Sequence, residues 1–240
     1  MKTILHPADT RGHANHGWLD TYHTFSFANY NNPERVHFGA LRVFNDDTVL
    51  GGYGFAKHPH DNMEIISIPL EGDLEHTDSI GNTAVIRKGD VQVMSAGTGI
   101  AHSEKNHSEQ HPTNFLQIWV IPNKRGAQPR YGQTTFDTAN RHNRLQLIVS
   151  PNPADGATWV NQNAWFHLAH IEAGVALEDY AMKGSGNGVY AFVIAGNVTV
   201  AGQTLARRDG FGIWEADGEP ISIVANEDTE LLLMEVPMIF

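Results

Sequence analysis

The chain has 240 residues, of which 41% are hydrophobic and 18% charged, and its formal charge is −11. This apolar content suffices for one large domain or two small ones with real cores, and it excludes intrinsic disorder. The acidic excess argues against direct binding to nucleic acid, which needs clustered lysine and arginine. Cysteine is absent, which excludes disulfides, thiolate zinc sites and thiol nucleophiles.

The sequence has no feature of a membrane or secreted protein. No apolar run approaches the ~20 residues that span a bilayer. Residues 1–17 lack the apolar core of a secretory signal. We therefore expect a soluble cytoplasmic protein. Its unusual feature is its 14 histidines.

Short apolar segments separated by glycine turns predict an all-β protein. In chain order, the expected strands cover residues 64–70, 74–76, 83–86 and 91–94, with turns at 71–73, 79–82 and 88–90. Strands of about five residues at this spacing are typical of an antiparallel sandwich or barrel. No long segment has the 3.6-residue periodicity of an amphipathic helix.

The second half of the chain repeats the pattern of the first. Residues 189–200 match residues 65–76 as an apolar strand, a glycine followed by Asp or Asn, and an alternating strand. Residues 208–211 similarly match 88–91. An ordered internal match of this length predicts two tandem β-barrels. We assign the first to residues 1–130 and the second to residues 131–240, with the linker in residues 122–130 or just beyond.

Two pairs of side chains have the spacing of metal ligands on strands. His58 and His60 form one pair, and His102 and Glu104 form the other. Side chains two residues apart in a strand share a face, with Cα atoms about 6–7 Å apart. Two such strands facing each other in a barrel would bring three imidazoles and one carboxylate to one ion. Pro59 places its strand at a start, an edge or a bulge, because proline cannot donate to a sheet.

This set of donors limits the metal without choosing it. Three neutral imidazoles and one carboxylate leave a divalent ion with a net charge of about +1. Nitrogen and oxygen donors without sulfur suit Fe(II), Mn, Co, Ni, Cu or Zn. A six-coordinate ion would keep two positions for water, an anionic substrate or O₂, whereas four-coordinate zinc would be closed and structural.

The order of these motifs resembles the cupin superfamily. Its first motif matches Gly52, the His58-x-His60 pair and Gly72. Glu64 matches the carboxylate of the general cupin motif, but lies one residue earlier than in the common spacing. The second motif lacks its usual proline and is two residues longer. With these departures, the chain most closely resembles the pirin family, in residues 11–20, 23–27, 55–65 and 94–104.

Resemblance to pirins implies a bicupin, which is two tandem cupin barrels. It implies that only the first barrel binds metal, through His58, His60, His102 and Glu104, while Glu64 has a supporting or structural role. The expected ion is Fe(II), with Zn, Ni, Cu, Mn or Co as alternatives.

Resemblance to bacterial pirin-like bicupins also implies an activity, that of a quercetin 2,3-dioxygenase. Such an enzyme cleaves a flavonol with O₂ and releases CO. Its partners would be a small aromatic substrate and O₂, with the aromatic rings held in an apolar barrel. Glu104 would be either the fourth ligand or the base that takes the proton of the flavonol 3-hydroxyl.

Two other functions stay open on the same scaffold. One is a redox-sensing, metal-binding regulator that acts through a protein partner. The other is a different cupin metal enzyme, an isomerase or hydrolase, since a fold does not determine chemistry. Dependence of turnover on O₂ separates this last function from the dioxygenase.

Other notable side chains receive structural interpretations. The second half has no His-x-His, and His167 and His170 are three residues apart, which puts them on opposite faces of a strand. Trp18, Phe25 and Phe27 are interpreted as core residues of the first barrel rather than as a cover over its mouth.

Overall fold

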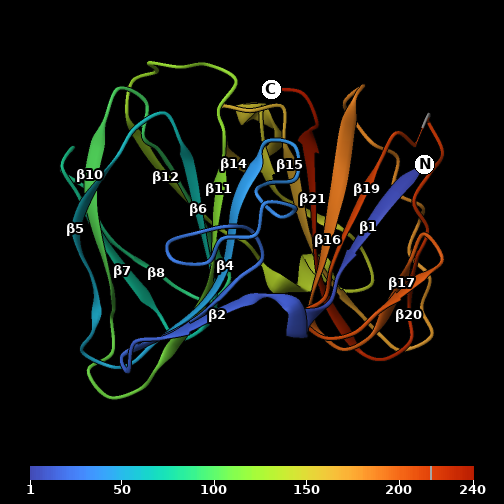
Figure 1. Cartoon of the computed structure of the whole chain (residues 1–240), viewed down its shortest axis with the longest axis horizontal. Helices are drawn as coiled ribbons and strands as arrows, with labels where there is room; N and C mark the ends of the chain where they lie inside the picture. The colour runs from blue at the N-terminus through green and yellow to red at the C-terminus, as the bar shows by residue number, and fades with distance from the viewer. Residues whose placement is uncertain (217) are drawn as a thin grey trace.

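Two largely antiparallel β-barrels lie side by side in the computed structural model, which describes residues 1–216 and 218–240 (Figure 1). Each barrel combines a seven-stranded sheet with a smaller one. The helical turns in the described residues are short 3-10 segments: η1 (Ala8–Thr10), η2 (Thr138–Arg141) and η3 (Pro153–Asp155). This arrangement confirms the predicted all-β fold of two tandem barrels.

The first barrel contains the predicted histidine pairs. Its large sheet has the order β12 (Arg130–Thr135), β9 (Asp90–Ser95), β6 (Glu64–Glu71), β11 (Thr113–Val120), β4 (Leu41–Val49), β3 (Leu19–His23) and β2 (Gly12–Asn15). Its small sheet has the order β5 (Gly54–His60), β10 (Ile100–Asn106), β7 (Leu74–Asp78) and β8 (Thr83–Ile86).

The second barrel repeats this plan with shorter strands in the small sheet. Its large sheet has the order β1 (Lys2–His6), β19 (Gly210–Trp214), β16 (Asn187–Ala195), β21 (Thr229–Pro237), β15 (Trp165–Ile171), β13 (Gln146–Ser150) and β14 (Thr158–Trp159). Its small sheet has the order β18 (Gln203–Leu205), β17 (Val198–Val200) and β20 (Ile223–Ala225).

The internal repeat seen in the sequence is a repeat of structure. The four strands predicted between residues 64 and 94 are β6, β7, β8 and β9. The strand pairs β6–β7 and β16–β17 both turn at a glycine in the left-handed region, with φ +69° at Gly72 and φ +87° at Gly196. Glycine enters this region at no steric cost, which is why the turn was recognisable in both halves.

Strand pairing crosses the predicted division at residue 130 in two places. The N-terminal strand β1 pairs with β19 of the second barrel, and Figure 1 shows the blue strand beside the orange ones. Strand β12, which follows the predicted linker at 122–130, pairs with β9 of the first barrel. The division at residue 130 therefore stays a prediction, and the exchanged strand β1 ties the two barrels together.

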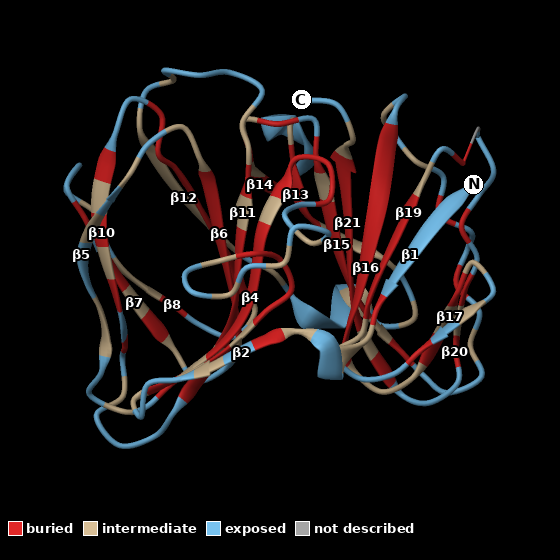
Figure 2. Cartoon of the chain, viewed as in Figure 1, coloured by how far each residue is buried: buried red, intermediate tan, exposed pale blue. Residues whose placement is uncertain are grey.

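The large sheets of the two barrels pack against each other through buried aromatic side chains. Phe44 on β4 meets Phe192 on β16 with ring centroids 4.5 Å apart. The same core cluster takes residues from β6, β11, β15 and β21, all buried in the centre of Figure 2. No helix among the described residues is both long and apolar enough to cross a membrane.

Candidate metal centre

Pairing of β5 with β10 brings the two predicted side-chain pairs together. His102 lies directly opposite His58, and Ile100 lies opposite His60. Strand β5 is at the edge of its sheet, as Pro59 predicted. Because His58 and His60 share one face of β5 and Pro59 is exposed on the other, both imidazoles project from the same face of the sheet as His102.

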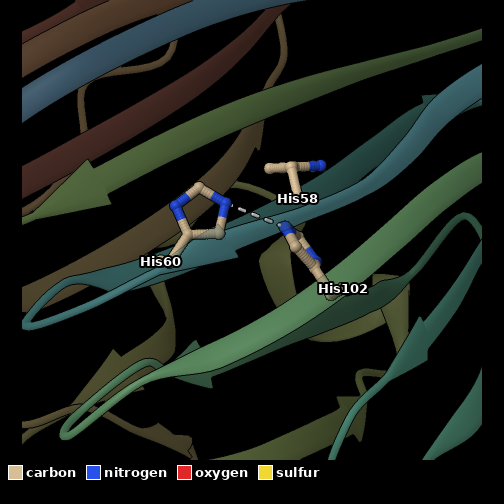
Figure 3. Close-up of side chains that lie close together, drawn as sticks. All are labelled: His58, His60 and His102. Carbon is tan, nitrogen blue, oxygen red and sulfur yellow. Dashed lines mark hydrogen bonds between the residues drawn. The ribbon is translucent and has the colours of Figure 1, made fainter.

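Three imidazoles converge where these strands meet (Figure 3). His60 Nε2 lies 3.0 Å from His102 Nε2. The ring of His58 has its centroid 4.8 Å from that of His60 and 4.6 Å from that of His102. His58 Nδ1 is 2.8 Å from the carbonyl oxygen of Ala56 and donates to it, so its Nε2 keeps a free lone pair.

The protonation state of this group suits a metal ion. Burial, with the charge of His58, lowers the pKa of His60 to about 4. Burial, with the charges of His58 and His60, lowers the pKa of His102 to about 2. Both rings are therefore neutral at pH 7 and offer lone pairs, which is the state that metal ligation requires. A donor set of three imidazoles fits a divalent transition-metal ion.

Glu104 lies beside His102 but outside the group of three histidines. The register of β5 and β10 shifts between His102 and Glu104, so Glu104 lies opposite Phe55 on one side and His76 on the other. Its carboxylate accepts hydrogen bonds from Ser67 Oγ at 3.1 Å and Gln117 Nε2 at 2.6 Å. Its role as a fourth ligand stays a prediction.

The environment of Glu104 suits a group that exchanges protons. Its side chain is buried, and burial raises the pKa of Glu104 to about 7 despite the hydrogen bonds from Ser67 and Gln117. At neutral pH such a carboxyl group is close to half ionised. That is the property of an effective general base or acid.

Two functional candidates, His76 and Asp78, were missed in the sequence. They alternate along β7 and both face the barrel interior, where neither side chain is exposed. His76, His102 and Glu104 form a second group of three ligand-type residues within 4.8 Å of one another. The sequence could have indicated them, because both are polar residues at positions of the strand that alternate toward the buried face. Buried polar groups need hydrogen-bond partners, so such residues point to an internal polar cluster.

Aromatic side chains form a wall beside the three histidines. The ring of Trp119 meets His60 edge-on at 4.9 Å, and Phe27 meets Trp119 at 5.4 Å. The ring of His23 packs on Phe27, with centroids 5.3 Å apart. Phe25 lies in the core as predicted, whereas Phe27 contacts the wall of the site.

Glu64 has the structural role that the resemblance allowed. It is buried and accepts hydrogen bonds from Ser95 Oγ at 2.8 Å and from the backbone of Asn161 at 3.1 Å. These bonds fasten the loop after β14 to the first barrel. None of the three histidines contacts it through a hydrogen bond in the described structure.

In the second barrel, His167 and His170 have separate partners. His167 is buried and packs edge-on against Tyr180 at 5.2 Å, whereas His170 stacks on His142 at 6.0 Å. Across the described residues, the clusters of three ligand-type side chains lie in the first barrel.

Comparison with known proteins identifies the family. A model described as Pirin matches residues 5–120, and a model of the quercetinase C-terminal cupin domain matches residues 147–236. The chain is 44% identical over 234 residues to quercetin 2,3-dioxygenase of Escherichia coli K12, with 97% of this chain and 98% of the relative covered. The chain belongs to the pirin family.

Other pirins and solved structures agree with this assignment. This pirin is 40% identical over 230 residues to a pirin-like protein of Caulobacter vibrioides, covering 95% of this chain and 97% of the relative. An E. coli pirin solved in complex with nickel(II) is 42% identical, with a TM-score of 0.90 over 98% of this chain and 99% of that one. The three-histidine group of this pirin has the residues to hold a metal ion.

A buried carboxylate near the site makes the stability of this pirin depend on pH. Asp47 on β4 is buried and accepts a hydrogen bond from the Thr21 hydroxyl. Burial, with the charges of Asp46 and Glu104, raises the pKa of Asp47 from its ordinary 3.8 to about 7. Its contribution to stability is full below about pH 4 and is lost as the pH rises through 7.

We expect Asp47→Asn to raise the unfolding temperature at pH 8 by at least ~2 °C, with no gain at pH 4. Asparagine keeps an oxygen for Thr21 and has no charge to bury. Thermal unfolding followed by circular dichroism from pH 4 to 8 measures the difference, with the exposed Asp9→Asn as control. A difference between variant and wild type that is constant with pH would contradict the prediction.

Proposed function

We propose that this pirin is a metal-dependent quercetin 2,3-dioxygenase, an oxidoreductase that cleaves a flavonol with O₂ and releases CO. One observation carries the proposal. Three histidines converge in the first barrel of a chain that is 44% identical, over nearly its full length, to an E. coli protein of that name.

His58, His60 and His102 would hold the metal ion. The nickel(II) bound by the E. coli pirin supports a divalent ion, and we propose Fe(II) here, with the other ions that suit nitrogen donors as alternatives. When bound, the ion would supply positive charge that favours the ionised 3-hydroxyl of the substrate, and an orbital path for electrons toward O₂.

Glu104 is proposed to take the proton of the flavonol 3-hydroxyl. Ser67 Oγ lies 3.1 Å from both Glu104 Oε1 and Gln117 Oε1, so its hydroxyl can turn to Gln117 and free Glu104 Oε1. Gln117 Nε2 meanwhile holds the other carboxylate oxygen in place. The buried carboxylate, with its raised pKa, is a stronger base than one in water.

The reaction needs no reactant other than the flavonol and O₂. Both atoms of O₂ enter the ring-opened product, and the carbon that carried the 3-hydroxyl leaves as CO with its oxygen. Glu104 returns its proton to the product. Trp119 and Phe27 would exclude water on one side and offer apolar faces to the aromatic rings.

The first test measures O₂ uptake and CO release with quercetin. Fe(II)-loaded protein is compared with metal-stripped protein and with protein reloaded with Ni(II). We expect one CO for each O₂ consumed, only with metal present. A fully loaded protein without turnover would favour a regulator that acts through a protein partner, and turnover without O₂ would indicate an isomerase or hydrolase.

We also propose a cytoplasmic location, because a chain without cysteine has no disulfide that needs an oxidising compartment.

A further inference from the structure

A buried line of polar side chains leads from Asp78 through His76 to the three-histidine group. His76 Nε2 lies 3.1 Å from Asp78 Oδ2, and His76 Nδ1 lies 3.4 Å from His102 Nδ1. His102 Nε2 in turn faces His60 Nε2 at 3.0 Å. The side chains of His76 and Asp78 are both fully buried, so water does not screen these contacts.

Counting protons along this line determines the tautomer of each ring. His102 presents Nε2 to the other two histidines, so Nε2 must carry the lone pair when the ring is a ligand, and Nδ1 carries the proton. That N–H faces His76 Nδ1, which must therefore be an acceptor. The proton of His76 is then on Nε2, where it donates to Asp78.

The Asp78 end of the line is held in place by its own loop. Asp78 Oδ1 accepts from the backbone N–H groups of Ile80 and Asn82, each at 3.0 Å, and Oδ2 accepts from Asn82 Nδ2 at 2.9 Å. An ionised carboxylate only accepts hydrogen bonds, so His76 must donate to it. The orientation of the whole line is thus set from this end.

We propose that His76 and Asp78 are positioning residues that hold His102 in the tautomer and orientation needed to bind metal. Metal-bound histidines commonly donate their second ring N–H to a carboxylate or carbonyl, and loss of that partner typically costs about 10–100-fold in metal affinity. Here a second histidine stands between the ligand and the carboxylate. The inference rests on the metal site of the proposed function but not on its substrate.

Asp78→Asn should reverse the polarity of the line. The two backbone N–H groups require an oxygen, so the amide nitrogen replaces Oδ2 and donates to His76 Nε2, and the side-chain amide of Asn82 flips to present its oxygen to it. The proton of His76 then moves to Nδ1, where it faces the N–H of His102. Two donors facing each other repel, which turns His102 away from the ligand geometry.

Affinity for Ni(II), measured by competition with a chelator, tests the proposal. We expect His76→Phe and Asp78→Asn each to weaken binding about 10–100-fold. The double variant should bind Ni(II) no more weakly than the weaker-binding single variant, because both changes disrupt the same chain of hydrogen bonds. The matched control is Tyr131→Phe. In the wild type the ring of Tyr131 packs 4.8 Å from that of His76, but its hydroxyl donates to Gln133 rather than to His76. Unchanged affinity, or losses that simply multiply, would overturn the proposal.

Long-range ¹H–¹⁵N NMR of the Zn(II)-loaded protein reads the tautomers directly. We expect the proton on Nε2 of His76 and on Nδ1 of His102, with the His76 proton shifted to Nδ1 in Asp78→Asn. A wild-type His76 protonated on Nδ1 would refute the proposal. Failure of the wild type to bind metal would instead refute the metal site itself, and quercetin turnover enters neither readout.

Discussion

His58→Ala is expected to lose both bound metal and quercetin turnover. The variant removes one of three nitrogen donors that meet between β5 and β10, and two imidazoles hold a divalent ion poorly. We expect metal affinity to fall at least ~100-fold, which exceeds the loss typical when a residue that hydrogen-bonds to a metal ligand is removed. The fold should persist, because His58 is half-buried on an edge strand. Metal content by mass spectrometry and O₂ uptake measure the two effects.

The control for this variant is His111→Ala, which removes an exposed histidine from the same barrel. It should bind metal and turn over quercetin like the wild type. Retention of wild-type metal content and turnover by His58→Ala would show that the ion is not held by this group. Loss of metal with undiminished turnover would separate the metal from the reaction and remove the proposed mechanism.

Glu104→Gln is expected to keep the metal and lose turnover by about 10²–10⁴-fold, the usual contribution of a general base. The three histidines converge without Glu104, and glutamine has nearly the shape of the carboxylate that Ser67 and Gln117 hold. In the wild type, kcat/KM should rise with pH until Glu104 is ionised. Its pKa is about 7, and a bound cation would move this rise to lower pH.

Measuring metal content and kcat/KM from pH 5 to 9 separates the two roles of Glu104. Retained metal with lost turnover, and loss of the rise in kcat/KM, identifies the base. Loss of metal together with turnover identifies a ligand instead, and full activity excludes both roles. Glu109→Gln, which changes an exposed carboxylate, serves as control and should behave like the wild type.

The sequence by itself determined those features that depend on local patterns. Alternating apolar residues and glycine turns located β6 to β9 and their repeat in the second half, because strand parity and positive φ leave marks within a few residues. The same parity placed His58 and His60 on one face, and Pro59 limited its strand to a start, an edge or a bulge. The family resemblance carried by residues 11–20, 23–27, 55–65 and 94–104 was confirmed by full-length similarity to other pirins.

Only the tertiary structure decided how strands far apart in the chain meet. Pairing of β10 with β7 put Glu104 opposite His76 and Asp78 opposite His102. Strand β1 pairs with β19, which lies about 200 residues further along the chain. A strand's own sequence specifies its faces, but its neighbours are selected by the packing of the whole barrel.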